Sequence, residues 1–108
     1  MRYLMTTKAT DTDAPDETLY AEMAKFVEEL TAAGVLLATG GLEAGGVRVA
    51  SSGDTITVTD GPFTEAKEAV AGFALVEVRS KEEAIEVTRR FRKIVGDGES
   101  VIQQVFGP

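Results

Sequence analysis

Short apolar runs, several of them alternating with polar residues, recur along the chain and predict β-strands. Val, Ile, Thr and aromatic residues are frequent in these runs, and Gly, Asp or Ser stands at most of their boundaries. Short Gly-containing segments separate the three middle runs, so we expect these to form a meander. The expected strands are residues 2–7, 35–43, 46–52, 54–60, 72–79 and 100–106.

Two longer segments repeat apolar residues at spacings of three and four, which is the pattern of an amphipathic helix. The first is expected to open at Pro15 and to end at Gly34. In the second, Ser80 and Glu83 have the spacing of a capping box, and Gly96 is a stop signal. The expected buried residues are Leu19, Met23, Phe26, Val27 and Leu30 in the first helix, and Ala84, Thr88, Phe91 and Val95 in the second.

This order of elements predicts a single α+β domain over residues 1–108, with a ferredoxin-like βαββαβ fold and an extra hairpin before its second half. In the strand at 72–79, Phe73 and Leu75 alternate with Ala74 and Val76, so both faces are apolar. Two helices can cover only one face of the sheet. We therefore expect a homodimer that buries the other face; a loop or the hairpin folding over that face is the alternative.

Composition narrows the possible functions of the chain. With 11 Lys and Arg against 18 Asp and Glu, the net charge is −7, which argues against a nucleic-acid partner. The absence of Cys and His removes thiolate catalysis and the usual ligands of transition metals, so we expect no metal and no cofactor. No apolar stretch is long enough to span a bilayer, and we expect a cytoplasmic protein without a membrane partner.

The stretch TDGPFTEAKE, residues 59–68, has an unusual density of turn, aromatic and charged residues. A structural interpretation explains much of it. Asp60 and Gly61 form a turn signal, Pro62 fixes its own φ angle, and Phe63 can anchor the loop in the core.

The charges in the same stretch suggest a functional interpretation instead. Carboxylates held beside an ammonium group can transfer protons if a cleft removes them from water. On spacing alone, a solvated surface loop is the favoured interpretation, since charged residues are mostly exposed. The candidate catalytic residues are Asp60, Glu65 and Lys67; the candidate ligand-binding residues are Tyr3, Arg48, Gly61, Pro62, Phe63 and Glu68.

The segment DGPFTEAKE closely resembles the hallmark of the DGPF group of YCII-related proteins. That hallmark is Asp-Gly-Pro-Phe, any residue, Glu, a small residue, Lys and Glu, with a glycine soon after, and Gly72 matches the glycine. The opening RYLMTT, the helix end ELTAAGVLL, the following GGLE and the VRV strand also have equivalents in the family. The resemblance therefore extends over nearly the whole chain.

The resemblance implies a dimeric ferredoxin-like α/β barrel. Members of the group look like small bacterial proteins often associated with extracytoplasmic-function sigma factors. The YCII branch is thought to use a His-Asp pair in a cleft near the dimer interface. This chain has no His, so the pair cannot be carried over, although Asp60 matches a comparable place.

Three functional hypotheses follow. The first is a small-molecule binding or sensing protein with a cleft near the DGPF loop. The second is a metal-independent lyase or isomerase that uses carboxylates, Lys67 or Tyr3 for proton transfer. The third is a structural or protein-interaction dimer, linked to sigma-factor regulation.

Overall fold

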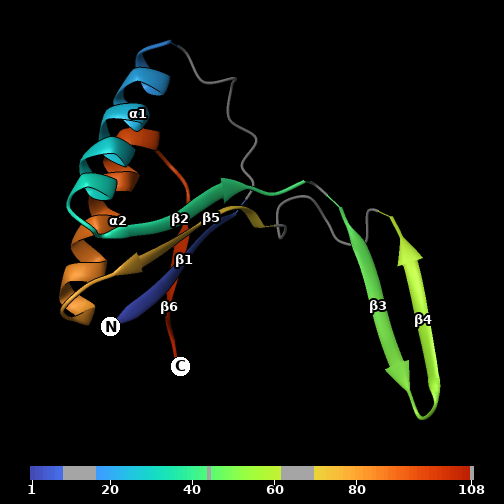
Figure 1. Ribbon diagram of the computed structural model, residues 1–108. Helices are drawn as coiled ribbons and strands as arrows, with labels where there is room; N and C mark the ends of the chain where they lie inside the picture. Colours follow the sequence, from blue (N-terminus) through green and yellow to red (C-terminus); the bar gives the residue numbers. More distant parts are fainter. Residues whose placement is uncertain (9–16, 44, 62–69, 108) are drawn as a thin grey trace.

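The computed structural model describes residues 1–8, 17–43, 45–61 and 70–107. Within these ranges, one strand precedes the first helix, four strands lie between the two helices, and one strand follows the second helix (Figure 1). They are β1 (Arg2–Lys8), α1 (Glu17–Ala32), β2 (Leu36–Gly41), β3 (Val47–Ser52), β4 (Thr55–Asp60), β5 (Val70–Glu77), α2 (Lys81–Val95) and β6 (Ser100–Val105).

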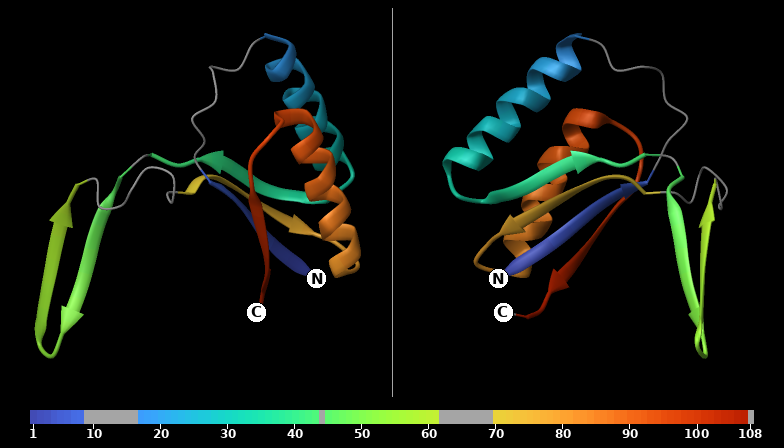
Figure 2. Two further views of the ribbon diagram at one scale, coloured as in Figure 1. Left: turned by 180° about the vertical axis from the view of Figure 1, so that it is seen from behind. Right: turned by 45° about the vertical axis from the view of Figure 1, so that its right-hand side comes forward.

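Four of the strands form the main sheet, in the order β2-β5-β1-β6. Every neighbouring pair in this sheet is antiparallel. Both helices lie on one face of it, as the two views in Figure 2 show. This mixed α+β arrangement agrees with the expected ferredoxin-like fold.

The helices end where the sequence indicates. The backbone N–H of Glu83 donates to the side-chain oxygen of Ser80 over 3.1 Å, which caps the start of α2. Gly34 and Gly96 follow the two helices with positive φ angles of 75° and 87°, a conformation that costs glycine little. The predicted start of α1 at Pro15 lies outside the described residues.

The core lies between the helices and the main sheet. Alternation along β1 and β5 sends Tyr3, Met5, Ala74 and Val76 toward the helices, where each is at least nine-tenths buried. On α2, Ala84 packs into the same core and is only 1% exposed. The helix-facing side of the sheet is therefore closed within one chain.

The other side of the main sheet is not covered by either helix. We call it the open face. Directly paired residues in an antiparallel sheet share a face, and the register places Leu4 opposite Leu75, and Thr6 opposite both Phe73 and Val101. The apolar residues of the open face are Leu4, Phe73, Leu75, Val101 and Val105.

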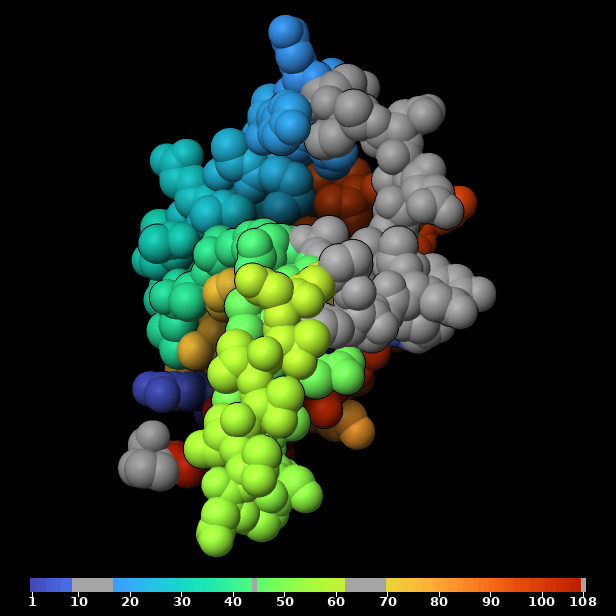
Figure 3. Space-filling view, turned by 90° about the vertical axis from the view of Figure 1, so that its right-hand side faces the viewer, coloured from blue at the N-terminus to red at the C-terminus, as the bar shows by residue number. Residues whose placement is uncertain are grey.

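The expected meander is wrong in one respect. All three strands form, but β2 pairs with β5 inside the main sheet, whereas β3 and β4 pair only with each other. After β2 the chain leaves the plane of the main sheet, and Gly46, with a φ of 118°, stands directly before β3. We call β3, β4 and their connecting turn, residues 47–60, the arm. It projects away from the main sheet and stands in front of it in Figure 3.

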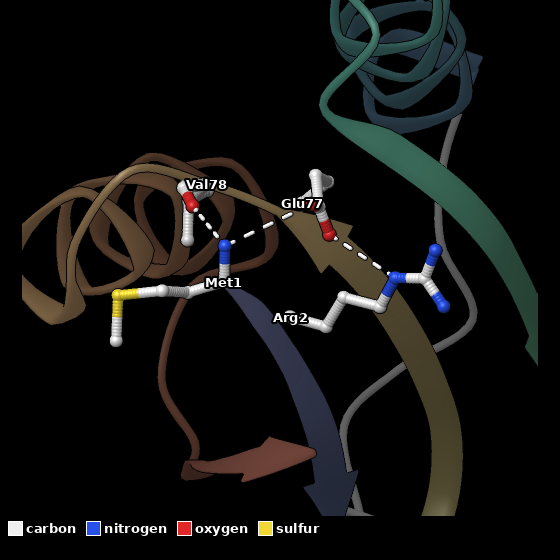
Figure 4. Close-up of polar contacts among 4 residues, drawn as sticks. All are labelled: Met1, Arg2, Glu77 and Val78. Carbon is white, nitrogen blue, oxygen red and sulfur yellow. Dashed lines mark hydrogen bonds and ion pairs between the residues drawn. The ribbon is translucent and has the colours of Figure 1, made fainter. Parts of the chain in front are cut away.

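Charged residues lie at one end of the open face. Arg2 and Glu77 are cross-strand partners, and the Nε atom of Arg2 donates to Oε2 of Glu77 over 3.1 Å (Figure 4). The amino group of Met1 lies 3.7 Å from the same carboxylate. The charges at this end of the open face are thus paired with each other.

Candidate functional site

The root of the arm holds the first two residues of the DGPF motif. Asp60 is the last residue of β4 and lies opposite Val47, the first residue of β3. The N–H of Gly61 donates to the carbonyl oxygen of Gly46 over 3.2 Å, so the two chain segments that enter and leave the arm are joined there. The backbone of Asp60 is therefore held on both sides, while its side chain is exposed.

The motif returns to the fold at the start of the central strand β5. Val70 pairs with Lys8 at the end of β1, and Gly72, which matches the glycine of the motif, pairs with Gly41. A Cβ atom on Gly72 would lie 3.2 Å from the carbonyl oxygen of Gly40. Glycine suits this position, because a side chain would require the backbone at Gly40 to move by a few tenths of an ångström. The motif thus connects the root of the arm to the middle of the main sheet.

Most of the predicted site lies outside the described residues. This applies to Pro62, Phe63, Glu65, Lys67 and Glu68. Their assignment as catalytic or ligand-binding residues stays a prediction.

Two other predicted ligand-binding residues stand apart from Asp60. Arg48 lies opposite Thr59, and neighbouring residues of a strand point to opposite faces, so Arg48 and Asp60 lie on different faces of the arm. Tyr3 is 5% exposed and belongs to the core cluster with Val76, Val78 and Ala84. Within one chain, the structure does not bring these residues together.

A polar cluster lies at the end of the main sheet where the motif joins β5, and the sequence did not predict it. The hydroxyl groups of Thr7 and Ser100 are 3.0 Å apart, and the guanidinium group of Arg92 donates to Ser100 over 3.3 Å. The ammonium group of Lys8, the cross-strand partner of Val70, lies 3.6 Å from the carboxylate of Glu99. The signal was weak, because Thr7 and Ser100 are 93 residues apart and only the pairing of β1 with β6 joins them.

This cluster borders an open hollow of about 450 Å³ between α2 and β6. Arg92 also donates to the carbonyl oxygen of Gly96 over 2.7 Å, so its charge already has protein partners. Three basic side chains of α2 line the hollow together with Ile85 and Thr88, and β6 contributes Ser100 and Ile102. Its lining residues are Ile85, Thr88, Arg89, Arg92, Lys93, Ser100 and Ile102.

A second, more enclosed space lies between the helices and the main sheet. Its walls are mostly apolar and include Met5, Met23 and Phe26. The space measures about 40 Å³, whereas one water molecule needs roughly 10–15 Å³ on the same scale. It can therefore hold a few water molecules but no ring-sized ligand unless the helices move.

Two further observations concern metals and membranes. Among the described residues, no group of three or more His, Cys, Asp or Glu is placed to hold a metal ion. Within the same parts of the chain, neither helix combines the length and the apolar character that crossing a membrane requires.

Comparison with solved structures supports the fold. A structure of 5-chloro-2-hydroxyhydroquinone dehydrochlorinase from Burkholderia phenoliruptrix AC1100, in complex with 2,5-dihydroxybenzoquinone, resembles the chain with a TM-score of 0.57. The match covers 100% of this chain and 96% of the dehydrochlorinase chain, at 16% sequence identity. At this identity the likeness shows a shared fold. Among curated proteins, none matches the chain in sequence.

Comparison with protein families gives the relationship directly. The model of the YCII-related domain matches residues 1–102. That range includes both helices, the arm and the main sheet. Only the last residues of β6 lie beyond it. The chain therefore belongs to the YCII-related domain family.

Proposed function

We propose that the protein is a small-molecule binding or sensing protein whose ligand lies beside the root of the arm. The observation that carries this proposal is the position of Asp60. Its backbone is held by its pairing with Val47 and by the neighbouring Gly61–Gly46 hydrogen bond, yet its carboxylate faces solvent. A charged group on a fixed backbone can contact a ligand without first losing much conformational freedom.

A structural neighbour with a bound ligand gives further support to this proposal. The dehydrochlorinase with the same fold was solved in complex with a small ligand, 2,5-dihydroxybenzoquinone, which supports small-molecule binding by this fold. The ligand of the present protein is not specified by that likeness, because fold and substrate vary independently.

We also propose that the protein is a homodimer, with the barrel arrangement expected of its family. The support is the open face, where Val101 and Val105 are 39% and 43% exposed and neither helix covers them. Apolar surface of this kind on a soluble chain marks an interaction site. A second copy offers the same surface, which suits a two-fold symmetric contact. The cytoplasmic location stays a prediction.

The function is tested by ligand binding to a matched pair of variants. Asp60→Asn removes the charge at the root of the arm, and Asp54→Asn makes the same change in the turn at the arm's far end. We expect a panel of small hydroxylated aromatic compounds and organic acids, with 2,5-dihydroxybenzoquinone as the first probe, to contain a compound that raises the melting temperature of the wild type. Titration calorimetry should then show binding weakened at least tenfold by Asp60→Asn and unchanged by Asp54→Asn. Equal affinities in all three proteins would place the ligand elsewhere.

A metal-independent lyase or isomerase is the second candidate, and the observation that favours it is that the structural neighbour is an enzyme, a dehydrochlorinase. In such a reaction Asp60 would accept a proton from carbon. Exchange of that proton for deuterium in D₂O, followed by NMR on a compound that binds, separates the two candidates. Exchange that depends on Asp60 indicates catalysis, and binding without exchange indicates a sensor. A dimer that binds none of the compounds would favour the interaction protein.

A further inference from the structure

The arm has one apolar face and one polar face. In its register Val49 lies opposite Val58, and Val47 and Ile56 lie on the same face. These four side chains are 58% to 70% exposed. The opposite face carries Arg48, Ala50, Thr57 and Thr59. Such a division is the pattern of a strand pair with one buried side, yet the single chain buries neither side.

A two-stranded ribbon cannot bury its own apolar face. An isolated hairpin is marginally stable in water at best, and a third strand or a packing surface is needed. No residue of β3 or β4 is buried or half-buried. The arm of one chain therefore lacks the contact that its apolar residues require.

The main body of the same chain does not supply this contact. The arm stands away from the sheet in the ribbon views (Figures 1 and 2). The radius of gyration is 16.1 Å, compared with about 13 Å for a compact domain of 100 residues. The added extent comes from an element that points outward.

We propose that the arm packs its apolar face against a second copy of this chain. This inference rests on the homodimer proposed above and assigns the arm a place in its interface. The arm leaves the sheet on the side opposite the helices, which is the side of the open face (Figures 1 and 2). In a dimer built on the two open faces, each arm is therefore directed toward the partner and extends the same interface.

The distribution of charge on the arm is compatible with contact to a second copy of the chain. The chain carries a net charge of −7, so two copies repel each other unless their contact surfaces are nearly uncharged. On the apolar face, Asp60 at the root is the only charged residue among those paired in β3 and β4. Arg48 lies on the other face. The surface offered to the second acidic chain is thus almost free of like charge.

The first test compares neighbouring residues on opposite faces of β4. Val58 and Thr57 are both β-branched and both exposed, and only Val58 lies on the apolar face. We expect Val58→Asp to weaken dimerisation at least tenfold in sedimentation velocity, because a charge would then be buried in the contact. Thr57→Asp is expected to leave the dimer unchanged. Equal effects of the two substitutions, or no effect of either, would overturn the inference.

The second test does not depend on the stability of a charged variant. The photoreactive residue p-benzoylphenylalanine is placed at position 58 or at position 57 of the full chain and then illuminated. We expect a covalent dimer from position 58 and little from position 57. A crosslink from position 58 into its own chain, or no crosslink, would overturn the inference.

The two proposals fail in different ways. If the wild type sediments as a monomer, both the homodimer and the proposed contact of the arm with a second copy are wrong. If the wild type is a dimer that position 58 does not crosslink, the arm inference is wrong and the open-face dimer remains. Ligand binding at Asp60 is measured separately from both results.

Discussion

The aromatic ring of Phe73 lies against Gly40, its cross-strand neighbour on β2. A Cβ atom added to Gly40 would be 3.3 Å from Cε1 of Phe73. This is closer than an ordinary contact, so the ring uses the space that glycine leaves. The pairing places a large apolar side chain on the open face, next to the glycine end of the edge strand β2.

The first prediction concerns this contact. Gly40→Val should lower the free energy of unfolding by about 1–3 kcal/mol, because the added methyl groups displace the Phe73 ring. Gly41→Val is the control, since a Cβ atom there would meet its nearest neighbour at an ordinary 3.7 Å. Urea denaturation followed by circular dichroism gives both values. Equal losses of stability at the two positions would mean that the Phe73 ring does not require glycine at position 40.

The second prediction concerns the start of α2. Ser80→Ala removes the oxygen that accepts the N–H of Glu83, and we expect a loss of about 1 kcal/mol in the free energy of unfolding. Ser80→Asp keeps an acceptor at the cap and adds a charge that the helix N-terminus favours, so most of the stability should remain. If thermal unfolding of the Asp variant matches that of the Ala variant, the cap is not what stabilises this helix.

The third prediction concerns the open face. Leu75 lies in the central strand β5, opposite Leu4 on one side and Ala38 on the other. In the proposed dimer, Leu75→Asp buries an unpaired charge and should yield monomers or insoluble protein. The control is Ala21→Asp, an exposed position on α1. Sedimentation that still finds a Leu75→Asp dimer would move the interface to another surface.

The fourth prediction concerns the ion pair at the end of the open face. The side chains of Arg2 and Glu77 are 54% and 46% exposed, so solvent weakens their attraction. Glu77→Gln should therefore lower the free energy of unfolding by less than about 1 kcal/mol. The difference from the wild type should shrink as salt is raised to about 1 M, because mobile ions screen exposed charges. A larger loss that persists in salt would indicate that the carboxylate has a buried partner.

Local signals were sufficient to place most elements. Ser80 and Gly96 predicted the ends of α2, and the spacing of Phe26 and Leu30 predicted the buried side of α1. Alternation in β5 also separated the two faces of the sheet correctly, with Ala74 toward the helices. Each of these features depends on residues close together in the chain, where propensity and periodicity act directly.

Long-range pairing could not be predicted in the same way. Nothing in the residues 36–41 shows that β2 pairs with β5 across the whole arm, because a strand's pattern records its burial but not its neighbour. Tyr3 was proposed as a ligand-binding residue from its chemistry alone, and its place in the core depends on the packing of α2. The Thr7–Ser100 contact likewise arises from register. At the motif, only Asp60, Gly61 and the later Gly72 lie within the described residues.

Asp60 is the last residue of the arm, next to the hydrogen bond between Gly61 and Gly46. A contact that fixes the position of the arm therefore also affects the position of this carboxylate. In a dimer where each arm rests on the other chain, ordering is coupled to association and follows mass action. The fraction of chains with a finished binding site would then rise with the amount of protein present. Dilution would then lower the fraction of chains in which the arm, with Asp60 at its root, is packed against a partner.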